Sequence, residues 1–142
     1  MTLFLYRVSH WLWRHKVPIL PRLIYLLNRV VCSAVVPPSA KIGKRVLLGY
    51  GGVGVVIHAR AVIGDRVTIS PNVTIGGRSG ERNVPIIGDD VLIGSGAKIL
   101  GPVRIGNCAK IGANAVVLED VPENATAVGV PASIVAVRAA AA

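Results

Sequence analysis

From residue 42 onward, an aliphatic residue recurs every six positions along the chain. The series is interrupted twice: nine residues separate Leu48 from Ile57, and Glu81 stands six residues after Ile75, where the next aliphatic residue is expected. Glycine most often follows the aliphatic residue, and a small or β-branched residue usually comes four positions after it. The aliphatic positions of the series are Ile42, Leu48, Ile57, Ile63, Ile69, Ile75, Ile87, Ile93, Ile99, Ile105, Ile111 and Val117.

A period of six does not match the helical period of about 3.6 residues, but it fits the two-residue period of a strand. Each repeat therefore predicts one short strand and a corner, with the aliphatic side chain inside and the glycine where the backbone turns. Three repeats make one triangular coil, and stacked coils make a parallel β-helix. We interpret the extra residues before Ile57 as an insertion, and Glu81 as the centre of a repeat that has lost its aliphatic residue.

Residues 1–36 lack the six-residue repeat and have the pattern of helices, with apolar and basic side chains on separate faces. Pro18 and Pro21 interrupt the first helix, and a second helix is expected from Arg22 to about Val31. The predicted domains are a helical amino-terminal segment (1–36), a β-helix domain (37–135) and a carboxyl-terminal tail (136–142).

The formal net charge of +9 is concentrated near the amino terminus. Residues 1–60 carry nine Lys or Arg and no Asp or Glu, whereas seven basic and seven acidic residues follow from Asp65 onward. Five of the six aromatic residues precede residue 30. We therefore expect the helical segment to cap the open end of the β-helix, to contact an anionic membrane surface through residues 1–31, or to do both.

The rest of the composition excludes several classes of protein. Hydrophobic residues make up 52% of the chain, which excludes a disordered protein. Cys32 and Cys108 are too few for a disulfide framework, so we expect a reducing, cytoplasmic location. No Cys and His spacing is typical of a metal site, and the basic segment lacks a nucleic-acid recognition motif, so neither partner is expected.

The six-residue repeat resembles that of the left-handed parallel β-helix acyltransferases, and longer stretches resemble the serine acetyltransferases. The resemblance covers nearly the whole chain, and it implies a left-handed β-helix, acetyl-CoA as the donor, and a homotrimer with active sites between neighbouring β-helices. The chain also resembles, in size and in its amino-terminal segment, the shorter acetyltransferases of exopolysaccharide gene sets. The stretches that carry the resemblance are residues 6–13 (YRVSHWLW), 40–43 (AKIG), 73–77 (VTIGG), 93–101 (IGSGAKILG), 109–113 (AKIGA) and 129–132 (GVPA).

On the donor side the family pattern is intact. The resemblance implies that Gly77, Ser95 and Ala113 line the acetyl-CoA site. Lys110 and Arg78 are candidates for contacts with the phosphates of the donor, because charged hydrogen bonds to phosphate are strong. No metal is expected in this chemistry.

On the acceptor side the chain departs from the family. Serine acetyltransferases carry a catalytic His after an Asp in the insertion of the early coils, but here residues 48–54 read LGYGGVG. The position of the family's partner Asp is occupied by Val35, and the family's Arg-His motif reads Arg82-Asn83. Tyr50, Arg82 and Asn83 therefore remain as candidates for binding the acceptor.

His58 is the only histidine outside the amino-terminal segment, and it stands where most repeats have glycine. Acyl transfer to a hydroxyl group needs a base, and histidine is the usual choice. We therefore predict that His58 is the catalytic base, with Asp65 or Glu81 as the candidate acid that orients it. A solvent-exposed corner histidine without a catalytic role is the competing interpretation.

The sequence thus predicts an acetyl-CoA-dependent O-acetyltransferase that is similar to serine acetyltransferases. Its acceptor is either serine or a hydroxyl group of a sugar on a polysaccharide precursor. The alternative is a non-catalytic hexapeptide-repeat trimer that serves as a scaffold or binding protein.

Overall fold

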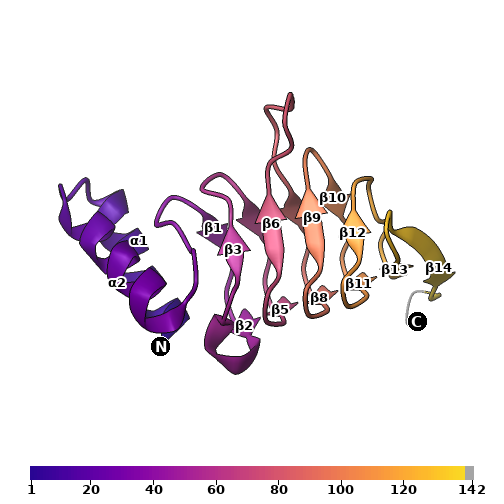
Figure 1. Ribbon diagram of the computed structural model, residues 1–142, viewed down its shortest axis with the longest axis horizontal. Coiled ribbons are helices and arrows are strands. Elements are labelled where there is room, and N and C mark those ends of the chain that lie inside the picture. Colours follow the sequence, from indigo (N-terminus) through magenta and orange to yellow (C-terminus); the bar gives the residue numbers. More distant parts are fainter. Residues whose placement is uncertain (140–142) are drawn as a thin grey trace.

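The computed structural model describes residues 1–139. Two helices, α1 (Thr2–Arg14) and α2 (Leu20–Cys32), lie side by side at one end, and short strands follow to the other end (Figure 1). One 3₁₀ turn, η1 (Gly49–Gly52), lies between β2 and β3. The strands are β1 (Lys41–Ile42), β2 (Leu47–Leu48), β3 (Val56–Ile57), β4 (Val62–Ile63), β5 (Thr68–Ile69), β6 (Thr74–Gly76), β7 (Ile86–Ile87), β8 (Leu92–Ile93), β9 (Lys98–Leu100), β10 (Arg104–Ile105), β11 (Lys110–Ile111), β12 (Val116–Val117), β13 (Ala125–Val128) and β14 (Ser133–Val137).

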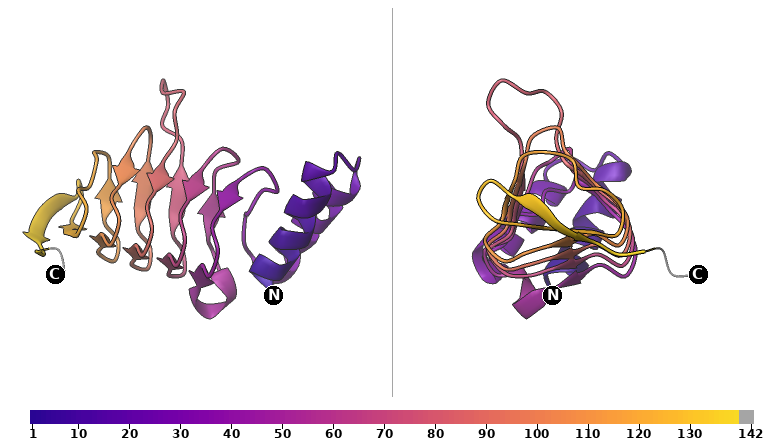
Figure 2. Two further views of the ribbon diagram at one scale, coloured as in Figure 1. Left: turned by 180° about the vertical axis from the view of Figure 1, so that it is seen from behind. Right: turned by 90° about the vertical axis from the view of Figure 1, so that its right-hand side faces the viewer.

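The strands form three sheets around one core. We call them face I (β1-β4-β7-β10), face II (β2-β5-β8-β11-β13-β14) and face III (β3-β6-β9-β12). Every pair is parallel except β13 with β14, and Figure 2 (right) shows the coils stacked in a triangular outline. On face I, Ile42 pairs with Ile63 and Ile63 with Ile87, so the recurring aliphatic residues do form buried ladders. The predicted β-helix with a helical amino-terminal segment is confirmed.

Two loops depart from the regular coil. The predicted insertion contains η1, at the corner between faces II and III. Residues 77–84 leave the core as a long loop at the corner between faces III and I (Figure 1). The prediction of a repeat centred on Glu81 is therefore wrong: this stretch has no aliphatic side chain to fill the core before Val84, and Glu81 is exposed.

The corner between faces I and II has the same left-handed backbone in successive coils. The residues with positive φ there are Arg45, Arg66, Asp90, Cys108 and Asn124. One position earlier, side chains link the coils: the amide of Lys44 donates to Asp65 Oδ1 (2.7 Å), that of Asp65 to Asp89 Oδ1 (2.8 Å), and that of Asp89 to Asn107 Oδ1 (2.8 Å). We call this series the Asx ladder.

A charged pair lies beside the Asx ladder. Arg66 donates from Nε and Nη2 to the two carboxylate oxygens of Asp90, at 2.8 and 2.7 Å. These hydrogen bonds hold the pKa of the Asp90 carboxyl below its usual range. Both side chains are about two-fifths exposed, so solvent screens the pair and its contribution to stability is small.

Both ends of the β-helix are covered. At the amino-terminal end, the buried Tyr6 hydroxyl donates to the carbonyl of Ala40 (2.7 Å) and Arg7 Nη1 donates to that of Ile42 (2.7 Å). Thr2 donates to the carbonyl of Gly51, so α1 contacts both the first coil and η1. At the other end, β14 pairs antiparallel with β13 and runs through Val137, across the predicted boundary at residue 135. Residues 140–142 of the predicted tail lie outside the described residues.

Removing one link of the Asx ladder should destabilise the fold. Asp89→Ala leaves the amide of Asp65 without its acceptor, which should lower the free energy of unfolding by about 1 kcal/mol. Asp89→Asn keeps an acceptor oxygen in the same place and is the matched control. Thermal unfolding followed by circular dichroism checks this expectation, and equal melting temperatures for the two variants would contradict it.

Candidate active site

The structure separates the candidate residues into two groups on different corners. His58 and the loop that carries Gly77, Arg78, Arg82 and Asn83 lie at the corner between faces III and I. The second group lies at the corner between faces II and III or on the adjoining strand β11. It consists of Tyr50, Ser95, Ala113 and Lys110. Figure 1 shows η1, which contains Tyr50, and the 77–84 loop on opposite sides of the β-helix.

The ring of His58 is held by the backbone rather than by an acid. Its Nδ1 accepts a hydrogen bond from the amide of Arg60 at 3.1 Å, so in the neutral ring the proton is on Nε2. The base of the loop passes close by, since a Cβ atom on Gly77 would lie 3.8 Å from Nε2. As it stands in this structure, His58 therefore presents an N–H donor beside the loop.

Neither predicted acid orients His58. Asp65 belongs to the Asx ladder at another corner, where its Oδ1 accepts from the amide of Lys44. Glu81 is an exposed residue of the loop. The prediction of an acid partner is thus not supported, and the amide of Arg60 holds the ring instead.

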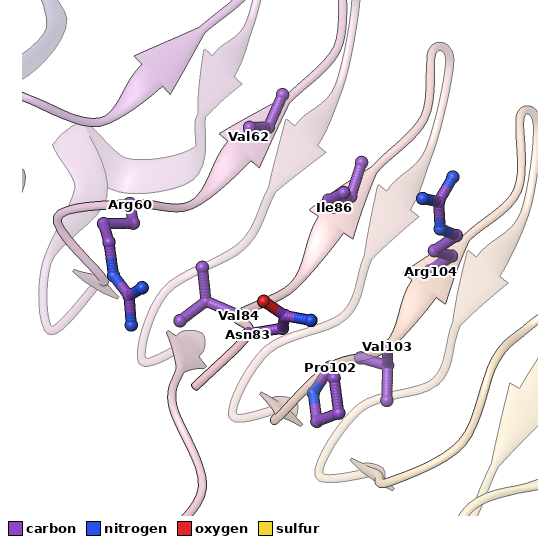
Figure 3. Close-up of a pocket in the computed structure, with 8 residues that line it drawn as sticks. All are labelled: Arg60, Val62, Asn83, Val84, Ile86, Pro102, Val103 and Arg104. Carbon is purple, nitrogen blue, oxygen red and sulfur yellow. The ribbon is translucent and has the colours of Figure 1, made fainter. Parts of the chain in front are cut away.

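A cavity of about 400 Å³ lies on face I beside the base of the loop (Figure 3). Arg60 and Arg104 lie on two sides of it, with Asn83 and Val84 between them (Figure 3). Arg60 Nη2 also donates to the carbonyl of Arg82 at 2.6 Å, which ties the loop to the coil that precedes it. Within residues 1–139 neither cavity arginine forms an ion pair, although the carboxylate of Asp120 accepts a hydrogen bond from the backbone amide of Arg104 at 2.7 Å. The cavity therefore suits a ligand with a negative group.

Sequence reasoning identified Asn83 but missed Arg60 and Arg104. Both arginines occupy outward positions of the repeat, which look like ordinary solvated positions in the sequence. The strand register could have revealed Arg104. Val62, Ile86 and Arg104 each precede a buried residue of face I, and because those buried residues pair, the three preceding side chains lie next to one another on successive coils.

The second group of residues lies on consecutive coils that approach closely. The amide of Asn114 donates to the carbonyl of Ser95 at 2.8 Å, and a Cβ atom on Gly94 would lie only 2.6 Å from the amide nitrogen of Ala113. Lys110 is exposed on β11 of the same coil. Tyr50 is 90% exposed, so its side chain has little contact within this chain. These residues form an open, largely backbone-lined surface.

No group of His, Cys, Asp and Glu within residues 1–139 is arranged to hold a metal ion. Nor does that part of the chain contain a helix with the length and apolarity needed to cross a membrane.

Comparison with known proteins identifies the group to which this chain belongs. Residues 85–119 match the model of the bacterial transferase hexapeptide (six repeats). Together with the triangular β-helix, this match defines the chain as a hexapeptide-repeat protein. Within that group it is a relative of the serine acetyltransferases, as the resemblance predicted.

Relatives and solved structures agree on this assignment. The chain is 40% identical to serine acetyltransferase of Synechococcus elongatus (94% of this chain, 55% of the relative) and 43% identical to that of Mycobacterium tuberculosis (92% and 57%). Soybean serine acetyltransferase complexed with serine superposes with a TM-score of 0.89 at 44% identity, covering 94% of this chain and 56% of that one. The Brucella abortus enzyme in complex with coenzyme A gives 0.92 at 34% identity, covering 98% and 56%. The chain spans little more than half the length of these relatives.

Arg60→Ala should loosen the 77–84 loop, because it removes the side-chain bond to the carbonyl of Arg82. Limited digestion with trypsin, followed by mass spectrometry, should detect cleavage after Arg78 and Arg82 several-fold faster than in the parent protein. Arg104→Ala is the matched control, since Arg104 lines the same cavity without that bond. Unchanged cleavage rates in Arg60→Ala would contradict this role.

Proposed function

We propose that the protein is an acetyl-CoA-dependent O-acetyltransferase that works as a homotrimer, with each active site between two neighbouring β-helices. The observation that carries the proposal is the separation of the candidate residues onto two corners of one β-helix. A single chain keeps them apart, whereas a neighbouring chain can set the corner with Tyr50 and Ser95 against a corner with His58 and the loop. The relatives are named serine acetyltransferases, and their solved structures include complexes with serine and with CoA.

In this arrangement the donor lies between two chains. Ser95, Ala113 and Lys110 of one chain form one wall, and Gly77 and Arg78 of the neighbour form the other. The wall at Ser95 and Ala113 is formed by small residues on closely spaced coils, so the extended donor can lie against the backbone. The cations of Lys110 and Arg78 offset the charge of the donor phosphates.

The acceptor contacts Tyr50 of one chain and Arg82 and Asn83 of the other. The guanidinium groups of Arg60 and Arg104, neither of which forms an ion pair within residues 1–139, favour an acceptor with a negative group. Serine has such a group in its carboxylate, and a phosphorylated or acidic sugar has one as well. We therefore retain both acceptors, serine and a sugar hydroxyl of a polysaccharide precursor.

In the reaction, the acceptor oxygen attacks the thioester carbonyl carbon, the acceptor proton moves to the base, and the carbon–sulfur bond then breaks to release CoA. For Nε2 of His58 to take the proton, the ring proton must first lie on Nδ1, which gives up the bond from the amide of Arg60. That bond is worth about 1 kcal/mol. A positioned base contributes roughly 10²- to 10⁴-fold in rate, which is about 3–5 kcal/mol. The free energy gained from a positioned base therefore exceeds the cost of losing this hydrogen bond, and His58 can still act as the base.

We place the reaction in the cytoplasm, where reduced cysteines persist, because Cys32 and Cys108 are both free thiols. The competing function is a trimeric scaffold that binds but does not transfer. The absence of any His or acid from the insertion, residues 48–54, is the observation that favours it.

Release of CoA thiol from acetyl-CoA, measured with serine and with a panel of neutral and anionic sugars, tests the function. We expect acceptor-dependent release with one of these classes, and His58→Ala should lower turnover by roughly 10²- to 10⁴-fold. His58→Gln distinguishes a role of His58 as a base from a role as a hydrogen-bond donor, because the glutamine amide can donate a hydrogen bond but cannot accept the proton. It should be as slow as His58→Ala.

The melting temperature of both variants should stay close to that of the parent, since His58 lies outside the buried core. His15→Ala, a change on the exposed end of α1, is the control. A folded His58→Gln protein with most of its turnover would make His58 a donor and shift attention to Tyr50. CoA binding without release for any acceptor would instead establish the scaffold.

Light scattering should give the mass of a trimer at micromolar concentration, because the site needs two chains. Ser95→Trp should abolish CoA binding in calorimetry without changing that mass, and Lys110→Ala should weaken binding modestly. Ser133→Trp, which adds the same bulk to the exposed strand β14, is the control. A monomeric protein would refute the two-chain site, and CoA binding by Ser95→Trp would refute the placement of the donor.

A further inference from the structure

The two helices that close the amino-terminal end have an unusual distribution of side chains. On α2 the buried residues are Pro21 and Asn28, whereas its leucines are exposed. Leu23 and Leu26 also border a cavity whose other side is formed by Pro37 and Pro38. On α1 the exposed Phe4, Val8 and Trp11 fall four and then three positions apart, so they form one stripe along the helix, and Trp13 is exposed outside this stripe. The outward apolar residues, each at least half exposed except Val8, are Phe4, Val8 and Trp11 on α1 and Leu23, Leu26, Leu27, Val30 and Val31 on α2.

We call this set of exposed apolar residues on the two helices the outer hairpin face. Val30, for example, is 80% exposed, while the polar Asn28 two positions earlier is buried. Contiguous apolar patches of this kind mark a contact with a partner or a membrane. The contacts of α1 with the first coil already use its other side, through Tyr6 and Arg7. The exposed stripe of α1 is therefore free for a second role, as are Leu27 and Val30 of α2, which line neither of the cavities between α2 and the coils.

The charged residues around this face indicate which kind of partner binds to it. The first 32 residues contain five basic residues and no acid. Arg7 is engaged with the carbonyl of Ile42, which leaves the exposed side chains of Arg14, Lys16, Arg22 and Arg29. A second copy of the same face would bring like charges together around an apolar contact, whereas anionic lipid headgroups neutralise them.

We propose that the outer hairpin face binds the surface of an anionic membrane. Each helix has 13 residues and lies in the plane of the interface, with leucines and valines toward the acyl chains and arginines among the headgroups. Trp11 and Trp13, both about half exposed, suit the boundary between headgroups and acyl chains. Because the hairpin covers only one end of the β-helix, the coils extend away from the membrane (Figure 2).

Co-sedimentation with vesicles tests this inference on the whole chain. We expect at least tenfold stronger binding to vesicles of phosphatidylcholine with phosphatidylglycerol than to phosphatidylcholine alone, with a loss of binding as salt is raised. Substitution is preferred to deletion of α1, because the buried Tyr6 is part of the fold.

Two double variants probe the two components of the face. Leu27→Asn with Val30→Asn should weaken binding at least tenfold, and Arg22→Gln with Arg29→Gln should remove most of the preference for anionic lipid. Matched controls on the β-helix are Leu47→Asn with Val137→Asn, and Lys44→Gln with Arg138→Gln, all at exposed positions. An unchanged melting temperature verifies that each variant is folded.

Equal binding to neutral and anionic vesicles, or no binding to either, would overturn the proposal. So would equal losses in the controls and in the hairpin variants. A different outcome is that the parent protein shows no binding to vesicles, while Leu27→Asn with Val30→Asn lowers the oligomeric mass in light scattering. In that case a second copy of the chain, rather than a membrane, binds to the outer hairpin face. Since this test does not measure acetyl transfer, its failure leaves the proposed function intact.

Discussion

The left-handed turn at the corner between faces I and II is the constraint on which the rest of the structure depends. Five residues other than glycine adopt positive φ there, a conformation that costs free energy for residues with a Cβ atom. The Asx ladder offsets that cost, because each link satisfies the backbone amide of the preceding coil. The first four coils are thus linked at this corner by their neighbours, and the β-helix gains its regularity from nearest-neighbour contacts.

This constraint also decides where the chain tolerates insertions. The corner that carries the Asx ladder has four residues between strands in each of the first four coils, without exception. Both long excursions, η1 and the 77–84 loop, lie at the other two corners. The candidate residues of the site lie at these two corners and on β11. The corner with the Asx ladder therefore keeps a constant length, while the other two corners carry the excursions and the candidate chemistry.

The sequence was sufficient for the fold because the six-residue period depends on local, repeated contacts. It failed at Glu81, because periodicity counts positions and cannot tell whether a repeat without an aliphatic residue stays in the core or leaves it. It also failed for the acid partner of His58. The ring is held by the amide of Arg60, a bond that depends on a side-chain rotamer, and proximity in sequence to Asp65 carries no such information. Arg60 and Arg104 were missed because only the stacking of coils brings them to one cavity.

The two proposed properties of the chain, acetyl transfer and membrane contact, depend on different parts of the structure. Acetyl transfer, as proposed, needs the corners of two chains, so assembly and chemistry depend on each other. Membrane contact, which is likewise a proposal, needs only the outer hairpin face on the cap at the amino-terminal end of the β-helix. Tyr6 and Arg7, on the inner side of α1, fix the cap to the β-helix, whereas residues such as Val30 are largely exposed. Under the membrane proposal these exposed residues contact lipid, and leucine beside arginine, without acids, suits an anionic lipid surface.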